Sequence, residues 1–201
     1  TKTVTAVTAA GVVTSAAHGY SDGDIVLIAA TNASFNGWHV ATDVTTNTFQ
    51  LQATGAVFSG SGTSVKHTET YFPVSSSTSN GGKQYMQDAT SGTLYEFDQE
   101  TFVDYVGAIA SRMRTPQIDD GSTRNKFMGG IELVGDKVST SALIRYSDDD
   151  YATYSNFRPV SLSGTRPRIT RTGKFRRRAI EVLHVGNALF RMQAVNVDVG
   201  G

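Results

Sequence analysis

Residues 3–8, Thr-Val-Thr-Ala-Val-Thr, alternate polar with apolar side chains, the pattern of a β-strand with one buried and one exposed face. Further apolar or alternating stretches follow at residues 12–14, 25–29, 38–41 and 48–52. Gly, Ser, Asn and Asp residues lie between these stretches and are typical of turns. Short strands at this spacing predict a small β-barrel or sandwich module over residues 1–66.

The composition extends the β prediction to the whole chain. The 201 residues include 25 Thr, 19 Ser and 20 Gly but only 4 Pro, and Thr favours the pleated, half-buried surface of a sheet. We therefore predict an all-β protein, in which a β-sandwich or propeller-like sheet domain follows the small N-terminal module.

Several classes of protein are excluded by what the sequence lacks. The chain contains no cysteine, which excludes disulfides, a thiolate zinc site and a cysteine nucleophile. No apolar run approaches the about 20 residues of a membrane-spanning helix, so we expect a soluble protein without a membrane anchor. The chain begins at Thr1 rather than at methionine, so we expect a processed, trimmed or internal start.

The composition changes between residues 67 and 82. Pro73 precedes a tract at residues 75–82 that reads Ser-Ser-Ser-Thr-Ser-Asn-Gly-Gly, a composition typical of a flexible linker or an exposed loop. We therefore predict a linker over residues 67–82 and a second β domain over residues 83–201.

Within the second domain, residues 84–88 and 92–98 are predicted to pair as strands around an intervening turn. The segment 101–115 carries apolar residues that suit either a helix face or a strand. Gly107 and the β-branched residues of this segment disfavour a helix, so we predict a strand.

Residues 127–135 and 137–146 are predicted to form a β-hairpin. The sequence after it, residues 147–156, resembles the Asp-box, a hairpin turn of pattern S-x-D-x-G-x-T-W, in which side chains hydrogen-bond the turn backbone and an aromatic ring packs beneath. A Ca²⁺ site of oxygen ligands is an alternative use of Asp148–Asp150, but their spacing is not that of an EF-hand loop. The candidate Asp-box residues are Ser147, Asp149, Thr153 and Tyr154.

The 18 basic and 18 acidic residues of the chain are unevenly distributed. Between Arg158 and Arg178 there are eight basic residues and no acid. Such a cluster either faces nucleic-acid phosphates or pairs with acids of a neighbouring subunit or of the turn at Asp148–Asp150, and we favour pairing and assembly. If residues 176–178 form a strand, Arg177 points away from its two neighbours. The candidate assembly or DNA-facing residues are Arg166, Arg168, Arg171, Lys174, Arg176, Arg177 and Arg178.

Two resemblances to known proteins follow from these residues. Residues 12–26, with the string His18-Gly19-Tyr20, together with Phe35-Asn36-Gly37 and residues 46–51, resemble a small β module that recurs in phage virion proteins. This resemblance implies a structural or docking module. His18 and His39 have no acidic residues at ligand spacing around them, so we interpret His18 as a packed turn residue rather than a metal ligand.

Residues 84–200 resemble the C-terminal part of the tail hub, nozzle or packaged-DNA stabilisation proteins of short-tailed phages. The resemblance is carried by Arg112-x-Arg114-Thr115-Pro116, by the Asp-box with Asn156-x-Arg158, and by Gly173-x-Phe175 with the three arginines that follow. It implies a homo-oligomeric ring, expected to be a hexamer, around the DNA channel of a virion tail. The partners it implies are an adaptor, fibres, spikes or a needle, with packaged DNA in the lumen. Such proteins are usually longer, so the resemblance leads us to expect that this chain is a fragment or a minimal version.

Three function classes remain open. A structural protein of a phage tail explains the β bias, the recurrent first module and the arginine-rich segment, and it requires neither catalysis nor a cofactor. A glycan-active enzyme is suggested by the Asp-box alone, and the sequence lacks an evident pair of catalytic carboxylates. The alternative to the structural protein is a non-catalytic glycan- or DNA-binding β module.

Overall fold

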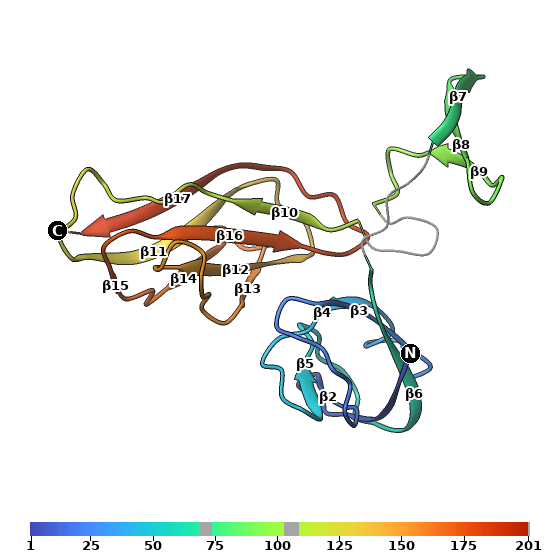
Figure 1. Cartoon of the computed structure of the whole chain (residues 1–201), viewed down its shortest axis with the longest axis horizontal. Coiled ribbons are helices and arrows are strands. Elements are labelled where there is room, and N and C mark those ends of the chain that lie inside the picture. Colours follow the sequence, from blue (N-terminus) through green and yellow to red (C-terminus); the bar gives the residue numbers. More distant parts are fainter. Residues whose placement is uncertain (69–73, 103–108, 201) are drawn as a thin grey trace.

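The structure is a computed structural model that describes residues 1–68, 74–102 and 109–200. Within these residues the chain forms 17 strands and no helix, so the prediction of an all-β protein is confirmed. No helix that could cross a membrane occurs in these ranges. Figure 1 shows three groups of strands, of which the smallest lies apart from the other two.

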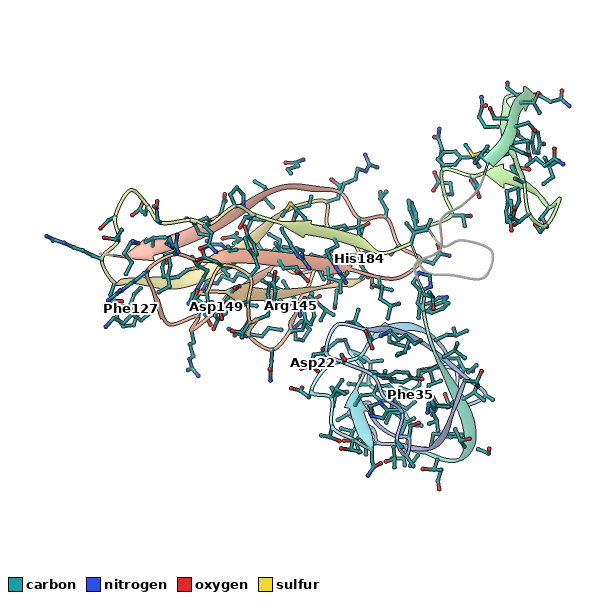
Figure 2. The ribbon with its side chains drawn as sticks, viewed as in Figure 1. Asp22, Phe35, Phe127, Arg145, Asp149 and His184 are labelled. Atoms are coloured by element: carbon teal, nitrogen blue, oxygen red, sulfur yellow. The ribbon has the colours of Figure 1, made fainter. Side chains whose placement is uncertain are left out.

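The first module is one curled sheet in which the strand order is β4-β3-β6-β1-β2-β5. A bridge between Thr42 and Gln50 joins the two edges of this sheet and curls it towards a closed barrel. Inside, Phe35 and Phe49 are fully buried among Val and Ile side chains, and Figure 2 shows Phe35 within the module. The strands are β1 (Lys2–Val7), β2 (Val12–Thr14), β3 (Ile25–Ala29), β4 (Gly37–Val40), β5 (Thr48–Gln50) and β6 (Phe58–Lys66).

A three-stranded sheet follows, formed by β7 (Val74–Asn80), β8 (Lys83–Asp88) and β9 (Leu94–Phe97). The predicted pairing of residues 84–88 with 92–98 is confirmed, because Gln84 to Gln87 lie opposite Phe97 to Leu94. The prediction of a linker or loop over the Ser-rich tract is wrong, because most of that tract forms β7. The tract lacks the apolar alternation that is typical of a strand, and all of its Ser and Thr side chains are exposed. It is a strand only because its backbone pairs with β8.

The remaining strands form two facing sheets. One has the order β10-β16-β12-β13, and in the other β11 lies between β17 on one edge and β14 and β15 on the opposite edge. Buried side chains from both sheets, among them Met128, Ile131, Ile144 and Val182, form one core. This domain is therefore a β-sandwich. Its strands are β10 (Ser111–Arg114), β11 (Lys126–Gly135), β12 (Ser141–Ser147), β13 (Arg158–Ser161), β14 (Arg168–Thr170), β15 (Lys174–Phe175), β16 (Ala179–His184) and β17 (Met192–Gly200).

The predicted hairpin between residues 127–135 and 137–146 is wrong. These segments form β11 and β12, which belong to opposite sheets and face each other across the core. Ile131, for example, pairs with Ile169 on one side and with Val197 on the other. Both hydrogen-bonding edges of β11 are therefore occupied by strands distant in sequence, so β12 crosses to the other sheet.

The predicted strand over residues 101–115 is found in part. Its last residues form β10, which pairs with β16 from Ser111–His184 to Arg114–Glu181. Residues 103–108 of the prediction lie outside the described residues.

The first module packs against the sandwich through a small apolar cluster. Ile25 and Val40 of the module contact Leu143, Phe157 and Leu183 of the sandwich. Gly23 adopts φ +91° beside the Phe157 ring, and a Cβ atom at Gly23 would lie 3.0 Å from a ring carbon. This contact covers the outer face of the sheet that contains β12 and β16, and it brings the loop after β12 close to the first module.

Candidate functional site

The turn that resembles an Asp-box follows β12 and is held by its own side chains. The Asp149 carboxylate accepts hydrogen bonds from Ser147 Oγ at 2.8 Å, from Thr153 N at 2.8 Å and from Thr153 Oγ1 at 2.5 Å. Ser147 Oγ in turn accepts a hydrogen bond from Tyr151 N at 3.0 Å. Tyr151 stands where the Asp-box pattern has glycine, and its φ of +69° lies in the left-handed region that favours glycine. The network therefore fixes a turn that its sequence alone disfavours at Tyr151.

The same hydrogen bonds lower the pKa of Asp149, with the Thr153 hydroxyl as the largest cause and its backbone N–H and the Ser147 hydroxyl as further causes. Because the pKa is depressed in the folded state, the turn is stabilised above about pH 4, the ordinary range of an aspartate pKa. This stabilisation is lost as the pH falls through the lowered folded-state pKa.

Thr153→Val is expected to raise the pKa of Asp149 towards that ordinary range, because valine keeps the shape of threonine but donates no side-chain hydrogen bond. The pKa is measured by NMR titration of the Asp149 side-chain carboxyl carbon. Thr165→Val, at an exposed residue outside the turn, is the control and should leave this pKa unchanged. An unaltered Asp149 pKa in the Thr153 variant would contradict the conclusion that the Thr153 hydroxyl is the main cause of the lowered pKa.

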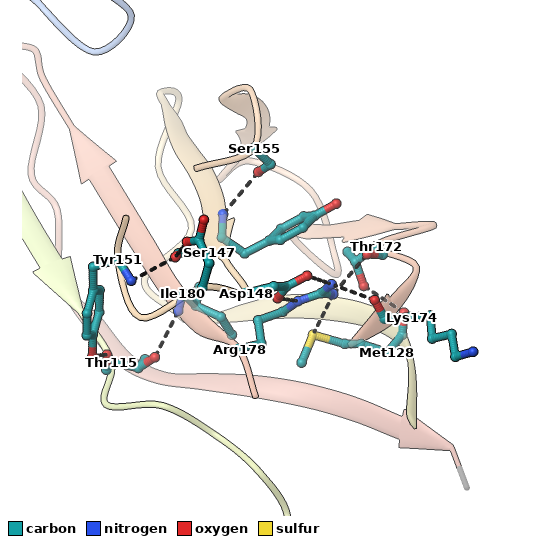
Figure 3. Close-up of polar contacts among 12 residues, drawn as sticks. Thr115, Met128, Ser147, Asp148, Tyr151, Ser155, Thr172, Lys174, Arg178 and Ile180 are labelled. Atoms are coloured by element: carbon teal, nitrogen blue, oxygen red, sulfur yellow. Dashed lines mark hydrogen bonds and ion pairs between the residues drawn. The ribbon is translucent and has the colours of Figure 1, made fainter. Parts of the chain in front are cut away.

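Arg178 lies buried beneath this turn (Figure 3). Its Nε and one terminal nitrogen donate to the two oxygens of Asp148, both at 2.7 Å, in a fork geometry. The other terminal nitrogen donates to the Thr172 carbonyl at 2.9 Å. The guanidinium also lies over the rings of Tyr146 and Phe175, 4.0 and 4.8 Å from their centroids. Arg178 is thus a core residue that ties the turn to the sandwich, and its assignment to an assembly or DNA-facing surface is wrong.

The prediction for residues 176–178 as a strand with alternating faces is also wrong. β15 ends at Phe175 and β16 begins at Ala179, and a bend at residues 176–177 separates them. Both Arg176 and Arg177 are therefore exposed on this bend, while Arg178 turns inward. The backbone of Arg178 is held by two hydrogen bonds with Ile118, and these keep the bend in place.

Two more arginines of the basic cluster pair with acids within the chain. Arg177 pairs with Asp150 at 2.7 Å, and Arg166 makes a two-pronged contact with Glu132 whose shortest distance is 2.6 Å. The turn at residues 148–150 thus supplies the acids for Arg177 and Arg178. This agrees with the alternative in which the basic cluster pairs with that turn. The exposed basic side chains that remain are those of Arg168, Arg171, Lys174 and Arg176.

A second ion-pair cluster, centred on Glu181, was not predicted from the sequence. Glu181 is fully buried in β16, and Arg114 and Arg145 lie directly opposite it on the neighbouring strands. Its carboxylate accepts from Arg114 Nε at 2.5 Å and from Arg145 at 2.9 Å, with Arg112 at 3.8 Å. The carboxylate of Glu181 raises the pKa of Arg114 further. An acid flanked on both sides by apolar residues and an Arg-x-Arg pair on another strand are the sequence signals that could have indicated this cluster.

The Asp-box aromatic residue belongs to the same cluster. The Arg145 guanidinium lies between the Tyr154 and Phe157 rings, 4.1 and 4.3 Å from their centroids. Figure 2 shows Arg145 and Asp149 in the same region of the sandwich. Since Phe157 also contacts the first module, the turn, the ion-pair cluster and the contact between domains form one connected region.

The histidines singled out in the sequence have structural surroundings. His18 is buried, its Nδ1 accepts a hydrogen bond from Tyr20 N, and its ring packs against Tyr20 and Phe49. Burial lowers the pKa of His39, whose Nε2 lies 2.9 Å from the Phe35 carbonyl oxygen. Across residues 1–68, 74–102 and 109–200, no group of three or more acidic, His or Cys side chains is placed to hold a metal ion.

Comparison with known proteins adds no relative to these observations. No protein-family model matches the chain, and no curated protein matches it either.

Proposed function

We propose that the chain is a structural protein of a phage virion tail that forms a homo-oligomeric ring around the DNA channel and docks other tail proteins. The observation that carries this proposal is the sheet of β7, β8 and β9, which covers no core of its own. Its one buried residue is Asp88, whereas Val74, Leu94 and Phe97 are 45, 62 and 62 % exposed.

A sheet of this kind requires a partner surface. Three strands are stable in water when they have a hydrophobic face to bury or another element to pack against. Within the described residues, β7 also leaves its outer edge unpaired over seven residues without a charge or a proline. Such an open edge is a template for pairing with another chain. We infer that a neighbouring copy covers this sheet. Contacts of one patch with a different patch on the next copy form a ring when the rotation between copies closes.

The resemblance of residues 84–200 to the C-terminal part of tail hub proteins supports the same proposal, since those proteins form rings. In a virion, the exposed faces of such a ring would be the docking surfaces for an adaptor, fibres, spikes or a needle. The fork between Arg178 and Asp148 and the Glu181 cluster would keep each copy rigid while these contacts form.

The proposal is tested by native mass measurement of the full chain. We expect the wild-type protein to form an assembly of several copies, and the double variant Leu94→Ser, Phe97→Ser to be a folded monomer, because less apolar area is then buried between copies. The control is Val57→Ser, Phe127→Ser, which removes two equally exposed apolar side chains outside the sheet and should leave the assembly intact. A wild-type protein that stays monomeric and binds a glycan would overturn the proposal in favour of a binding module.

A further inference from the structure

A cleft of about 750 Å³ lies between the loop that precedes β11 and the bend between β15 and β16. It is lined by Thr123, Arg124, Asn125, Arg176 and Arg177. Three of the five lining side chains are arginines, and none is acidic, aliphatic or aromatic. Within the described chain, the guanidinium groups of Arg124 and Arg176 have no hydrogen-bond or ion-pair partner. The lining therefore carries positive charge that the described part of the chain does not neutralise.

Both walls of the cleft are held by the interior of the sandwich. On one side, the buried Lys126 ammonium donates to the carbonyl oxygens of Ser122 and Arg124, and Ser122 Oγ accepts from Arg124 N at 3.2 Å. On the other side, Arg178 anchors the bend through its fork with Asp148. The two walls are joined by the backbone hydrogen bonds between Ile118 and Arg178, at 2.9 and 3.1 Å. The arginines thus project from fixed loops, which lowers the cost of ordering them around a ligand.

The chemistry of the lining selects an oxyanion. Guanidinium groups bind phosphate through two parallel hydrogen bonds, and Arg is the preferred residue for this contact. A protein partner would fit the cleft poorly, because the centres of protein interfaces contain apolar and aromatic side chains, and the described lining has none. Interfaces with nucleic acid are instead polar and strongly positive. The ion pair of Arg177 with Asp150 leaves Arg124 and Arg176 as the two free cations of this described lining.

We propose that this cleft binds phosphate groups of a nucleic-acid backbone, with Arg124 and Arg176 as the contacting residues and Arg177 held in position by Asp150. The choice of nucleic acid as the ligand rests on the proposed function, because a tail ring encloses DNA, whereas the preference for an oxyanion rests on the cleft alone. No aromatic side chain is among the five described residues that line the cleft, so stacking on bases contributes nothing there and binding is independent of base sequence.

The test is fluorescence anisotropy of a labelled DNA duplex titrated with the full chain over a series of salt concentrations. Arg124→Gln, Arg176→Gln is expected to weaken binding by on the order of tenfold or more at low salt. It should also reduce the slope of log K against log salt by about 2, one unit for each phosphate that an arginine no longer neutralises. The control is Lys2→Gln, Lys137→Gln, which removes the same charge at exposed residues outside the cleft and should change the affinity by less than about threefold.

Equal decreases in affinity for the two double variants, or no binding by the wild-type chain at low salt, would overturn the assignment of the cleft. Competition by polyglutamate as effective as competition by unlabelled duplex would also overturn it, in favour of an acidic protein partner. Repeating the titration with Leu94→Ser, Phe97→Ser separates the two proposals. If the protein is a monomer whose DNA binding depends on Arg124 and Arg176, the result supports the cleft and contradicts the ring. If it forms a ring whose DNA binding does not change when these arginines are replaced, the result supports the ring and contradicts the cleft.

Discussion

Replacing Arg178 with alanine is expected to lower the free energy of unfolding of the sandwich by about 3–5 kcal/mol, the usual cost of truncating a large buried side chain together with its hydrogen bonds. The side chain is 1 % exposed, and it satisfies Asp148 and the Thr172 carbonyl together. Alanine leaves that carbonyl without its partner and leaves a cavity between the Tyr146 and Phe175 rings. Arg178→Lys is expected to destabilise the sandwich less, because lysine keeps the charge but not the fork.

Urea denaturation followed by circular dichroism measures this destabilisation. Arg176→Ala is the control, because Arg176 is an exposed neighbour on the same bend and such a substitution changes stability by about 0.5 kcal/mol or less. Trp38, the one tryptophan of the chain, lies in β4 and packs on the apolar cluster between the first module and the sandwich, so its fluorescence reports on that contact as well as on the module. Equal destabilisation by Arg176→Ala and Arg178→Ala would show that Arg178 is not a core residue.

Replacing Glu181 with glutamine is expected to destabilise the sandwich by a similar amount, about 3–5 kcal/mol. Glutamine preserves the shape of the side chain but removes the negative charge between Arg114 and Arg145, which lie opposite it on both sides. Arg145 cannot turn into solvent easily, because its side chain is 14 % exposed and lies between two aromatic rings. The poorly hydrated Arg145 would then lack the acid that neutralises its charge, and it would also be repelled by the nearby Arg114.

The matched variant for this test is Glu132→Gln, which removes an acid from an ion pair with the largely exposed Arg166. Exposed pairs contribute about 0–1 kcal/mol, so this control should unfold at nearly the wild-type urea concentration. The difference in unfolding free energy between the Glu181→Gln and Glu132→Gln variants measures how much burial adds to the contribution of an ion pair. If both variants unfold at the same urea concentration, the Glu181 cluster does not stabilise the sandwich.

The strands of the first module could be predicted from the sequence because their signals are local. Residues 3–8 alternate in polarity, the following apolar stretches are short, and turn residues separate them; strands β1 to β5 lie at these places. The Asp-box turn is similar, since Ser147, Asp149 and Thr153 interact within a few residues of one another. Such contacts depend on spacing along the chain, which the sequence states directly.

Contacts between distant residues could not be predicted in this way. Nothing near β11 indicates that Val197 rather than Leu143 pairs with Ile131, because both β12 and β17 carry apolar residues that suit a sandwich core. The three arginines at residues 176–178 look equivalent in sequence, and only the end of β15 at Phe175 and the bridge to Ile118 separate the buried one from the exposed ones. Glu181 was missed because its partners come from two other strands.

The position of β17 alongside β11 sets the order in which the protein can fold during synthesis. β11 is complete when residue 135 has been made, yet the strand that pairs along nearly its whole length is the last described strand. The first module contains all of its strands by Lys66 and can fold while the ribosome is still translating the rest. The sandwich instead keeps one edge of β11 open, with its apolar face exposed, until residues 192–200 emerge. Its closure therefore depends on nonlocal pairing, which is intrinsically slow, and until then the open edge of β11 is a template for pairing with other chains.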